Sequence, residues 1–122
     1  MFDHVGFRVR NLEASRKFYL AALAPLGFEV AMEGNFGVGL GHGGKPEPWL
    51  SPGDPAASPL HIAFAARNRA EVDAFHAAAL AAGGKDNGAP GLRPHYHPNY
   101  YGAFAIDPDG HNIEAVCHRA AP

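Results

Sequence analysis

Two histidines, His4 and His61, begin two copies of one sequence pattern that lie 57 residues apart. The segment H-V-G-F-R-V-R-N at His4 matches H-I-A-F-A-A-R-N at His61, and the same offset aligns Phe18 with Phe75. Self-similarity at a fixed offset indicates an internal duplication. Because the halves of a duplicated fold tend to be related by an approximate twofold axis, equivalent histidines can converge on one point. Neutral imidazole is a common metal ligand.

A carboxylate near the C-terminus, Glu114, completes a possible ligand set. It lies between Ile113 and Ala115 in an expected strand, so its side chain points away from these apolar neighbours. The same alternation places His4 and His61 on the corresponding face of their own strands. Two imidazoles and a carboxylate are typical ligands of a divalent transition metal. Any one of the three could instead be a hydrogen-bonded strand residue, but the equivalence of the histidines favours a metal site.

The elements that must position these residues also repeat. Alternating apolar and polar residues predict strands over about 2–10 and 60–65, and Asn11 and Asn68 then start helices that run to about 24 and 82. Further strands are expected over about 28–32, 36–40, 48–51, 91–95, 100–106 and 112–118. The sequence therefore predicts an α+β fold of two β-α-β-β-β modules that form a cleft-lined sheet with helices packed outside. The modules span about 1–52 and 59–119 of one domain, 1–122.

Composition narrows the class of partner. Hydrophobic residues make up 47% of the 122 residues and charged residues 18%, with a net charge of −2, which disfavours both disorder and nucleic-acid binding. No apolar run approaches the ~20 residues of a membrane span, and no leader pattern opens the chain. One cysteine, Cys117, agrees with a reducing compartment. We expect a cytoplasmic protein that binds a small molecule rather than nucleic acid or a membrane.

The paired modules, the histidine at the start of each, and the ending D-P-D-G-H-N-I-E-A over 107–115 resemble the vicinal oxygen chelate superfamily. That superfamily includes glyoxalase I, fosfomycin-modifying thiol transferases, extradiol dioxygenases and bleomycin-resistance proteins. The resemblance covers nearly the whole chain. It implies one divalent ion, Zn, Ni, Mn, Co or Fe(II), held by His4, His61 and Glu114. It also implies a homodimer, whose site can lie within one chain or across an exchanged module.

The chain departs from glyoxalase I on the fourth strand. Glyoxalase I adds a glutamate ligand there, whereas this chain carries Trp49, and Glu47 is the nearest carboxylate on the same strand face. We therefore expect an open three-ligand centre, with Glu47 as the candidate base for lyase chemistry and Trp49 as a substrate-binding residue. Arg8 and Arg93 are candidates for gripping an anionic substrate.

Several residues of the second module are further candidates. Tyr100 and Phe104 alternate into the last hairpin, where Tyr100 could donate a hydrogen bond to a substrate oxygen and Phe104 could line the cavity or pack. His97 is a candidate for substrate binding, and the roles of His95 and His97 stay open. His111 lies in the expected D-P-D-G turn, where we predict an exposed side chain.

The leading functional prediction is a divalent-metal-dependent enzyme with glyoxalase-like lyase or isomerase, or thiol-addition, chemistry on a small oxygen-chelating substrate. One alternative is a metal-free binder of aromatic drugs, like the bleomycin-resistance proteins. Another is an extradiol ring-cleaving dioxygenase.

Overall fold

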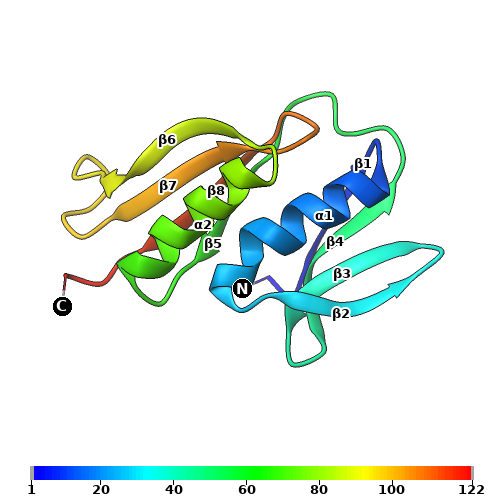
Figure 1. Cartoon of the computed structure of the whole chain (residues 1–122), viewed down its shortest axis with the longest axis horizontal. Coiled ribbons are helices and arrows are strands. Elements are labelled where there is room, and N and C mark those ends of the chain that lie inside the picture. Colours follow the sequence, from blue (N-terminus) through cyan, green and yellow to red (C-terminus); the bar gives the residue numbers. More distant parts are fainter. Residues whose placement is uncertain (1, 122) are drawn as a thin grey trace.

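The computed structural model describes residues 2–121 and contains two four-stranded sheets, each covered by one helix (Figure 1). The first module consists of β1 (Val5–Val9), α1 (Leu12–Leu23), the short 3-10 helix η1 (Ala24–Leu26), β2 (Glu29–Gly34), β3 (Gly37–His42) and β4 (Lys45–Pro52). The second consists of β5 (His61–Ala65), α2 (Arg69–Ala81), β6 (Lys85–Leu92), β7 (Tyr101–Ile106) and β8 (Asn112–Cys117). The predicted α+β fold of two β-α-β-β-β modules is confirmed.

The strand order is the same in both sheets, β1-β4-β3-β2 and β5-β8-β7-β6. In each sheet the first and last strands of the module pair in parallel, and the register is equivalent. Gly6, two residues after His4, pairs with Trp49, and Ala63, two residues after His61, pairs with Glu114. Trp49 therefore occupies in the first module the position that Glu114 occupies in the second.

Both long helices begin at a capping asparagine, as the sequence predicts. The Asn11 side-chain oxygen accepts a hydrogen bond of 3.0 Å from the Ala14 backbone N–H, and Asn68 accepts one of 2.8 Å from the N–H of Glu71. Each cap satisfies one of the N–H groups that have no partner within the first turn. Figure 1 shows α1 and α2 side by side, and the main hydrophobic core takes residues from both helices and both sheets.

The sixth strand differs from the prediction. A strand was expected over about 91–95, but β6 lies earlier, and residues 93–100 form turns that the Arg93 N–H closes onto the Tyr100 carbonyl at 2.7 Å. The β6 segment carries Gly88, Pro90 and Gly91 and lacks apolar alternation. It is a strand because it pairs with β7, with register shifts on both sides of Gly88. Because the pairing with β7, rather than a pattern within the segment itself, makes it a strand, the alternation rule missed it.

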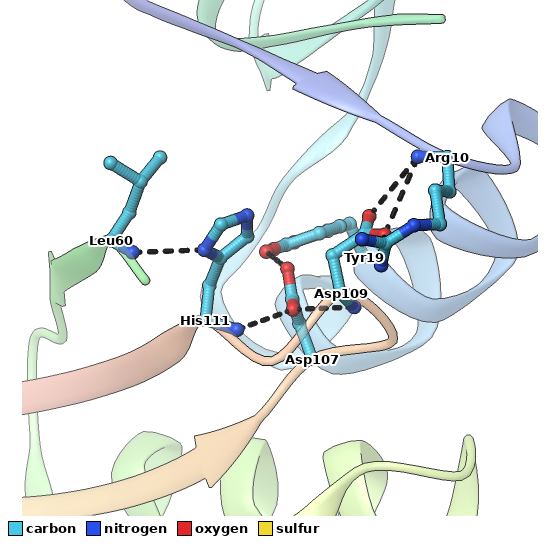
Figure 2. A network of polar contacts seen from close by, with 6 residues as sticks. All are labelled: Arg10, Tyr19, Leu60, Asp107, Asp109 and His111. Carbon is cyan, nitrogen blue, oxygen red and sulfur yellow. Dashed lines mark hydrogen bonds and ion pairs between the residues drawn. The ribbon is translucent and has the colours of Figure 1, made fainter. Parts of the chain in front are cut away.

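A polar network joins the two modules at the turn between β7 and β8 (Figure 2). The Asp107 carboxylate accepts hydrogen bonds from the Tyr19 hydroxyl of α1 and from the backbone N–H groups of Asp109, at 2.9 Å, and His111, at 2.8 Å. The Arg10 N–H, just after β1, is 3.4 Å from the carboxylate of Asp109.

The side chain of His111 is buried, so the prediction that it is exposed was wrong. Its Nδ1 accepts a 2.9 Å hydrogen bond from the Leu60 N–H, and its ring lies 5.8 Å from that of Phe7. The turn places the imidazole inward, between the start of β5 and the middle of β1. Within residues 2–121, no helix combines the length and apolar character that crossing a bilayer requires.

Candidate metal and substrate site

The carboxylate of Glu114 lies between an imidazole and a phenol. One oxygen is 2.8 Å from Nε2 of His61, and the hydroxyl of Tyr100 donates a hydrogen bond to the other. Glu114 is only 1% exposed, although sequence alternation placed it opposite the packed face of β8. It is buried because β8 is an inner strand of its sheet and the side chains around it cover the second face as well.

Strand pairing explains why these groups meet. Glu114 pairs with Ala63 of β5 on one side and with Phe104 of β7 on the other, so its carboxylate lies close to the side chain of His61. The neighbouring Gly102 leaves room for the contact with Tyr100. A Cβ atom at Gly102 would be 3.2 Å from Oε2 of Glu114 and 3.2 Å from the Tyr100 ring, closer than side chains ordinarily pack.

A cavity of about 490 Å³ opens over these three residues and is also lined by Tyr96, His97 and His118. His97 was a predicted substrate-binding residue, whereas Tyr96 and His118 were not among the predicted site residues. His118, the residue after β8, continues the alternation of Glu114, and this pattern is the sequence signal that points to it. Tyr96 left no such signal because the turns after β6 determine its position.

The electrostatics of the site favour a protonated phenol. Desolvation raises the pKa of Tyr100, and the nearby Glu114 carboxylate raises it further because it stabilises the hydroxyl as a donor. At neutral pH Tyr100 is therefore a hydrogen-bond donor rather than a base. The described residues that line the cavity include no lysine or arginine.

His4 lies away from this cavity. The middle of β1 is close to the β7–β8 turn, because the Phe7 ring lies 5.8 Å from that of His111. His4 precedes Phe7 by three residues, or about 10 Å of extended chain. His4 instead lines a second cavity, of about 180 Å³, with Glu47 and the segment 62–64. Among residues 2–121, no three His, Cys, Asp or Glu side chains are grouped closely enough to hold a metal ion. Metal binding by His4, His61 and Glu114 stays a prediction.

The other candidates of the first module are also separate from Glu114. The Trp49 ring lies over Gly39, whose added Cβ would be 2.5 Å from the indole, and packs against Phe36 with ring centroids 5.3 Å apart. Arg8 lies along Gly53 at the end of β4. These residues and Glu47 belong to the half of the molecule that carries His4.

Phe104 and Arg93 pack together near the cavity. The Phe104 ring is 6.1 Å from that of His61, and the guanidinium of Arg93 covers Phe104 at 5.4 Å. The same guanidinium donates hydrogen bonds of 2.8 and 2.9 Å to the carbonyls of Ala89 and Gly91. Arg93 thus holds the irregular β6 strand in place, and this arrangement directs its donors toward the backbone rather than toward the cavity.

The donor set of the second module fits a divalent ion. An imidazole nitrogen and a carboxylate oxygen, 2.8 Å apart, both face the cavity. Two such donors at about 2.1 Å from one ion are roughly 3.0 to 3.4 Å apart for ligand angles between 90° and tetrahedral. His61 and Glu114 would therefore need to separate by only a few tenths of an ångström. His61 and Glu114 are two of the three protein ligands of the expected open centre, and within residues 2–121 no third His, Cys, Asp or Glu side chain is grouped with them.

Comparisons with known proteins agree with the fold. Residues 1–115 match the Glyoxalase/Bleomycin resistance protein/Dioxygenase superfamily. A glyoxalase/bleomycin resistance protein from Albidiferax ferrireducens T118 is 32% identical, with a TM-score of 0.83 over 98% of this chain and 99% of that one. A putative glyoxalase from Bacillus halodurans is 26% identical, with a TM-score of 0.72 over 96% and 95% of the two chains.

A lactoylglutathione lyase from Agrobacterium tumefaciens shares the fold at 20% identity, with a TM-score of 0.69 over 96% of this chain and 92% of that one. The search of curated proteins found no match. These similarities confirm the resemblance that the repeated modules and the D-P-D-G-H-N-I-E-A ending predicted.

Proposed function

Because the chain belongs to the Glyoxalase/Bleomycin resistance protein/Dioxygenase superfamily, we propose that it is a divalent-metal-dependent enzyme acting on a small substrate with paired oxygen atoms. The proposed chemistry is that of a glyoxalase-like lyase or isomerase, or of thiol addition. His61 and Glu114 hold the ion, with His4 as the third protein ligand. The two modules act as one glyoxalase/dioxygenase-like domain.

The observation that carries this proposal is the position of Glu114. A carboxylate that is 1% exposed loses nearly all of its hydration, which is costly unless paired groups replace the water. Here its partners are His61 and Tyr100, and all three face one cavity. A buried carboxylate beside an imidazole at the base of a cavity is an arrangement suited to binding a metal cation.

The separation of His4 from Glu114 supports a site shared between two copies of the chain. Each copy presents His61 and Glu114 on one module and His4 on the other, and the two groups line different cavities. In a symmetric dimer the first module of one copy can face the second module of its partner, which completes two equivalent sites. We propose this arrangement rather than a site within one chain.

A divalent ion at this site supplies Lewis-acid stabilisation of negative charge on substrate oxygens. The residues of the chain orient the substrate and exclude water. Tyr100, which stays protonated, donates a hydrogen bond, and Tyr96 and His97 form the walls of the cavity. Trp49 stands where Glu114 stands in the other module, so the partner copy contributes an indole face rather than a fourth ligand. Glu47, beside His4, is the proposed base.

Metal analysis of the purified protein tests the ligand set. Glu114→Gln keeps the size of the side chain and one acceptor oxygen but removes the negative charge, so we expect the metal content to fall from about one ion per chain to a small fraction of that. Glu13→Gln is the matched control, since Glu13 is an exposed carboxylate that forms an ion pair with Lys17. Full metal retention in folded Glu114→Gln would contradict the proposal.

Co-expression of two differently tagged variants tests the shared site. His4→Ala and His61→Ala each break every site in their own dimers, whereas the mixed dimer regains one intact site if ligands come from both copies. We expect about one ion per purified mixed dimer, half the wild-type content, and almost none in either parent dimer. A mixed dimer as empty as its parents would show that the ligands come from a single chain.

A dioxygenase is the second candidate, because the cavity brings His97, His118 and Tyr100 together with His61 and Glu114. Such a set offers acid–base groups beside the metal ligands. Anaerobic loading with Fe(II), followed by oxygen uptake with a catechol, would support it. Tight binding of planar drugs to metal-free protein, measured by Trp49 fluorescence and without turnover, would instead favour the non-catalytic binder.

A further inference from the structure

The carboxylate of Asp3 forms a hydrogen bond with one ring nitrogen of His4. Its Nδ1 is 2.8 Å from Oδ1 of Asp3. Because a carboxylate only accepts hydrogen bonds, Nδ1 must carry the proton, and a neutral imidazole then has its lone pair on Nε2. Within residues 2–121 no hydrogen bond engages Nε2 of His4. The ring is therefore set to present a free lone pair on that side.

Asp3 is in turn held by Lys45, the first residue of β4. The Lys45 ammonium donates to the Asp3 carbonyl at 2.8 Å, to Asp3 Oδ1 at 3.1 Å and to the Pro46 carbonyl at 2.9 Å. An ammonium has three donors, and all three are used. These bonds tie the segment before β1 to the β3–β4 hairpin. Lys45 consequently acts on Asp3 rather than on a substrate anion.

The second module has no carboxylate at the position that corresponds to Asp3. Leu60 stands before His61 at the position of Asp3, and the pairing partner two residues on is Glu114 rather than Trp49. His61 is thus oriented by the second ligand itself, through the 2.8 Å contact between Nε2 and Glu114. His4 has only an indole at the equivalent position and needs a different group to orient it.

We propose that Asp3 is a positioning residue for His4, held in place by Lys45, and that it prepares Nε2 of His4 for metal ligation. This inference rests on the proposed function. A carboxylate that accepts the second N–H of a ligating histidine fixes the tautomer and raises the basicity of the ring, and its loss typically lowers metal affinity about 10- to 100-fold. The side chains of Asp3 and Lys45 are 75% and 51% exposed, so their ion pair contributes little to folding. Variants at both positions should therefore fold normally.

The test uses the dimer stripped of metal and titrated with Co²⁺ against a chelator. We expect Asp3→Ala to weaken Co²⁺ binding about 10- to 100-fold without lowering thermal stability. Lys45→Ala should weaken binding by a smaller factor and should add nothing in the Asp3→Ala background, because Lys45 acts through Asp3. Glu13→Ala and Lys17→Ala, which break another exposed ion pair, should bind as wild type does.

A second readout, independent of metal, follows the tautomer of His4. In ¹⁵N spectra of the metal-free protein, we expect a protonated Nδ1 in the wild type and loss of that preference in Asp3→Ala. Wild-type Co²⁺ affinity in Asp3→Ala, combined with weakened affinity in His4→Ala, would overturn this inference and leave the proposed function standing. Wild-type affinity in His4→Ala itself would overturn both.

Discussion

Replacing Tyr19 by phenylalanine should destabilise the junction between the two modules. The Tyr19 side chain is fully buried, and its hydroxyl donates to the Asp107 carboxylate across that junction. Phenylalanine keeps the ring, which packs edge-on against Phe7 at 5.9 Å and Phe18 at 5.1 Å, so no large cavity forms. The variant therefore isolates the hydrogen bond.

The size of the effect follows from what remains around Asp107. A hydrogen bond to a charged group contributes about 1.5–3 kcal/mol. Asp107 keeps its backbone donors from Asp109 and His111, so the carboxylate is not left without partners and the loss should be near the lower end, about 1.5–2 kcal/mol. With a denaturant dependence near 2 kcal/mol per M, the urea midpoint should fall by about 1 M.

The difference in unfolding free energy between the wild type and Tyr19→Phe should depend on pH. Desolvation, followed by the Asp107 carboxylate, raises the pKa of Tyr19 in the folded state. The unfolded chain then loses this phenolic proton near pH 10 while the folded chain keeps it, so wild-type stability falls above that pH by up to about 1.4 kcal/mol per pH unit. Tyr19→Phe lacks this proton. The stability of Tyr19→Phe should therefore be below that of the wild type by the whole of about 1.5–2 kcal/mol at any pH below about 10, and this gap should shrink as the pH rises further.

Urea unfolding of both proteins at pH 7 and across pH 9–11 measures these quantities. Tyr96→Phe is the control, because Tyr96 is 62% exposed and its hydroxyl has no hydrogen bond within residues 2–121. A deficit below about 0.5 kcal/mol for Tyr19→Phe, within the range of ordinary surface substitutions, would refute the reasoning.

Two further predictions concern glycine packing and a histidine. Gly102→Ala should leave the fold intact but displace the Glu114 carboxylate, since the new methyl group would be 3.2 Å from it; metal affinity should fall, and unchanged affinity would show that the glycine is not needed there. His42 keeps its proton to a higher pH than a free histidine does. The 3.0 Å hydrogen bond to the Leu26 carbonyl raises its pKa, and Glu47 raises it more weakly. A raised folded-state pKa stabilises the protein below the ordinary value near 6.5 and loses this effect as pH rises through the folded pKa. His42→Gln should thus destabilise the protein more at pH 5.5 than at pH 8.5, by urea unfolding; an equal deficit at both would contradict this.

Elements with a strong local pattern were predicted closely. Asn11 and Asn68 start helices where expected because an N-cap depends only on residues within one turn. The strands that begin each module show their alternation in five residues. By contrast, β6 is a strand only because β7 pairs with it, and His111 is buried only because Leu60 and Phe7 surround it. Leu60 and Phe7 are far from His111 in the sequence, and the β6 segment has no apolar alternation of its own, so a local pattern could predict neither feature.

The amino-acid sequence alone specifies the duplication, the family, and the types of donor available at His4, His61 and Glu114. Alternation along a strand also specifies the face on which each donor lies. Only the tertiary structure decides which donors meet, because strand pairing and the packing of one module on the other depend on contacts between distant segments. The β5–β8 register brings His61 to Glu114, and the pairing of β7 with β8 brings Tyr100 to the same carboxylate. His4, just before β1, instead lies beside Asp3 and lines a different cavity with Glu47.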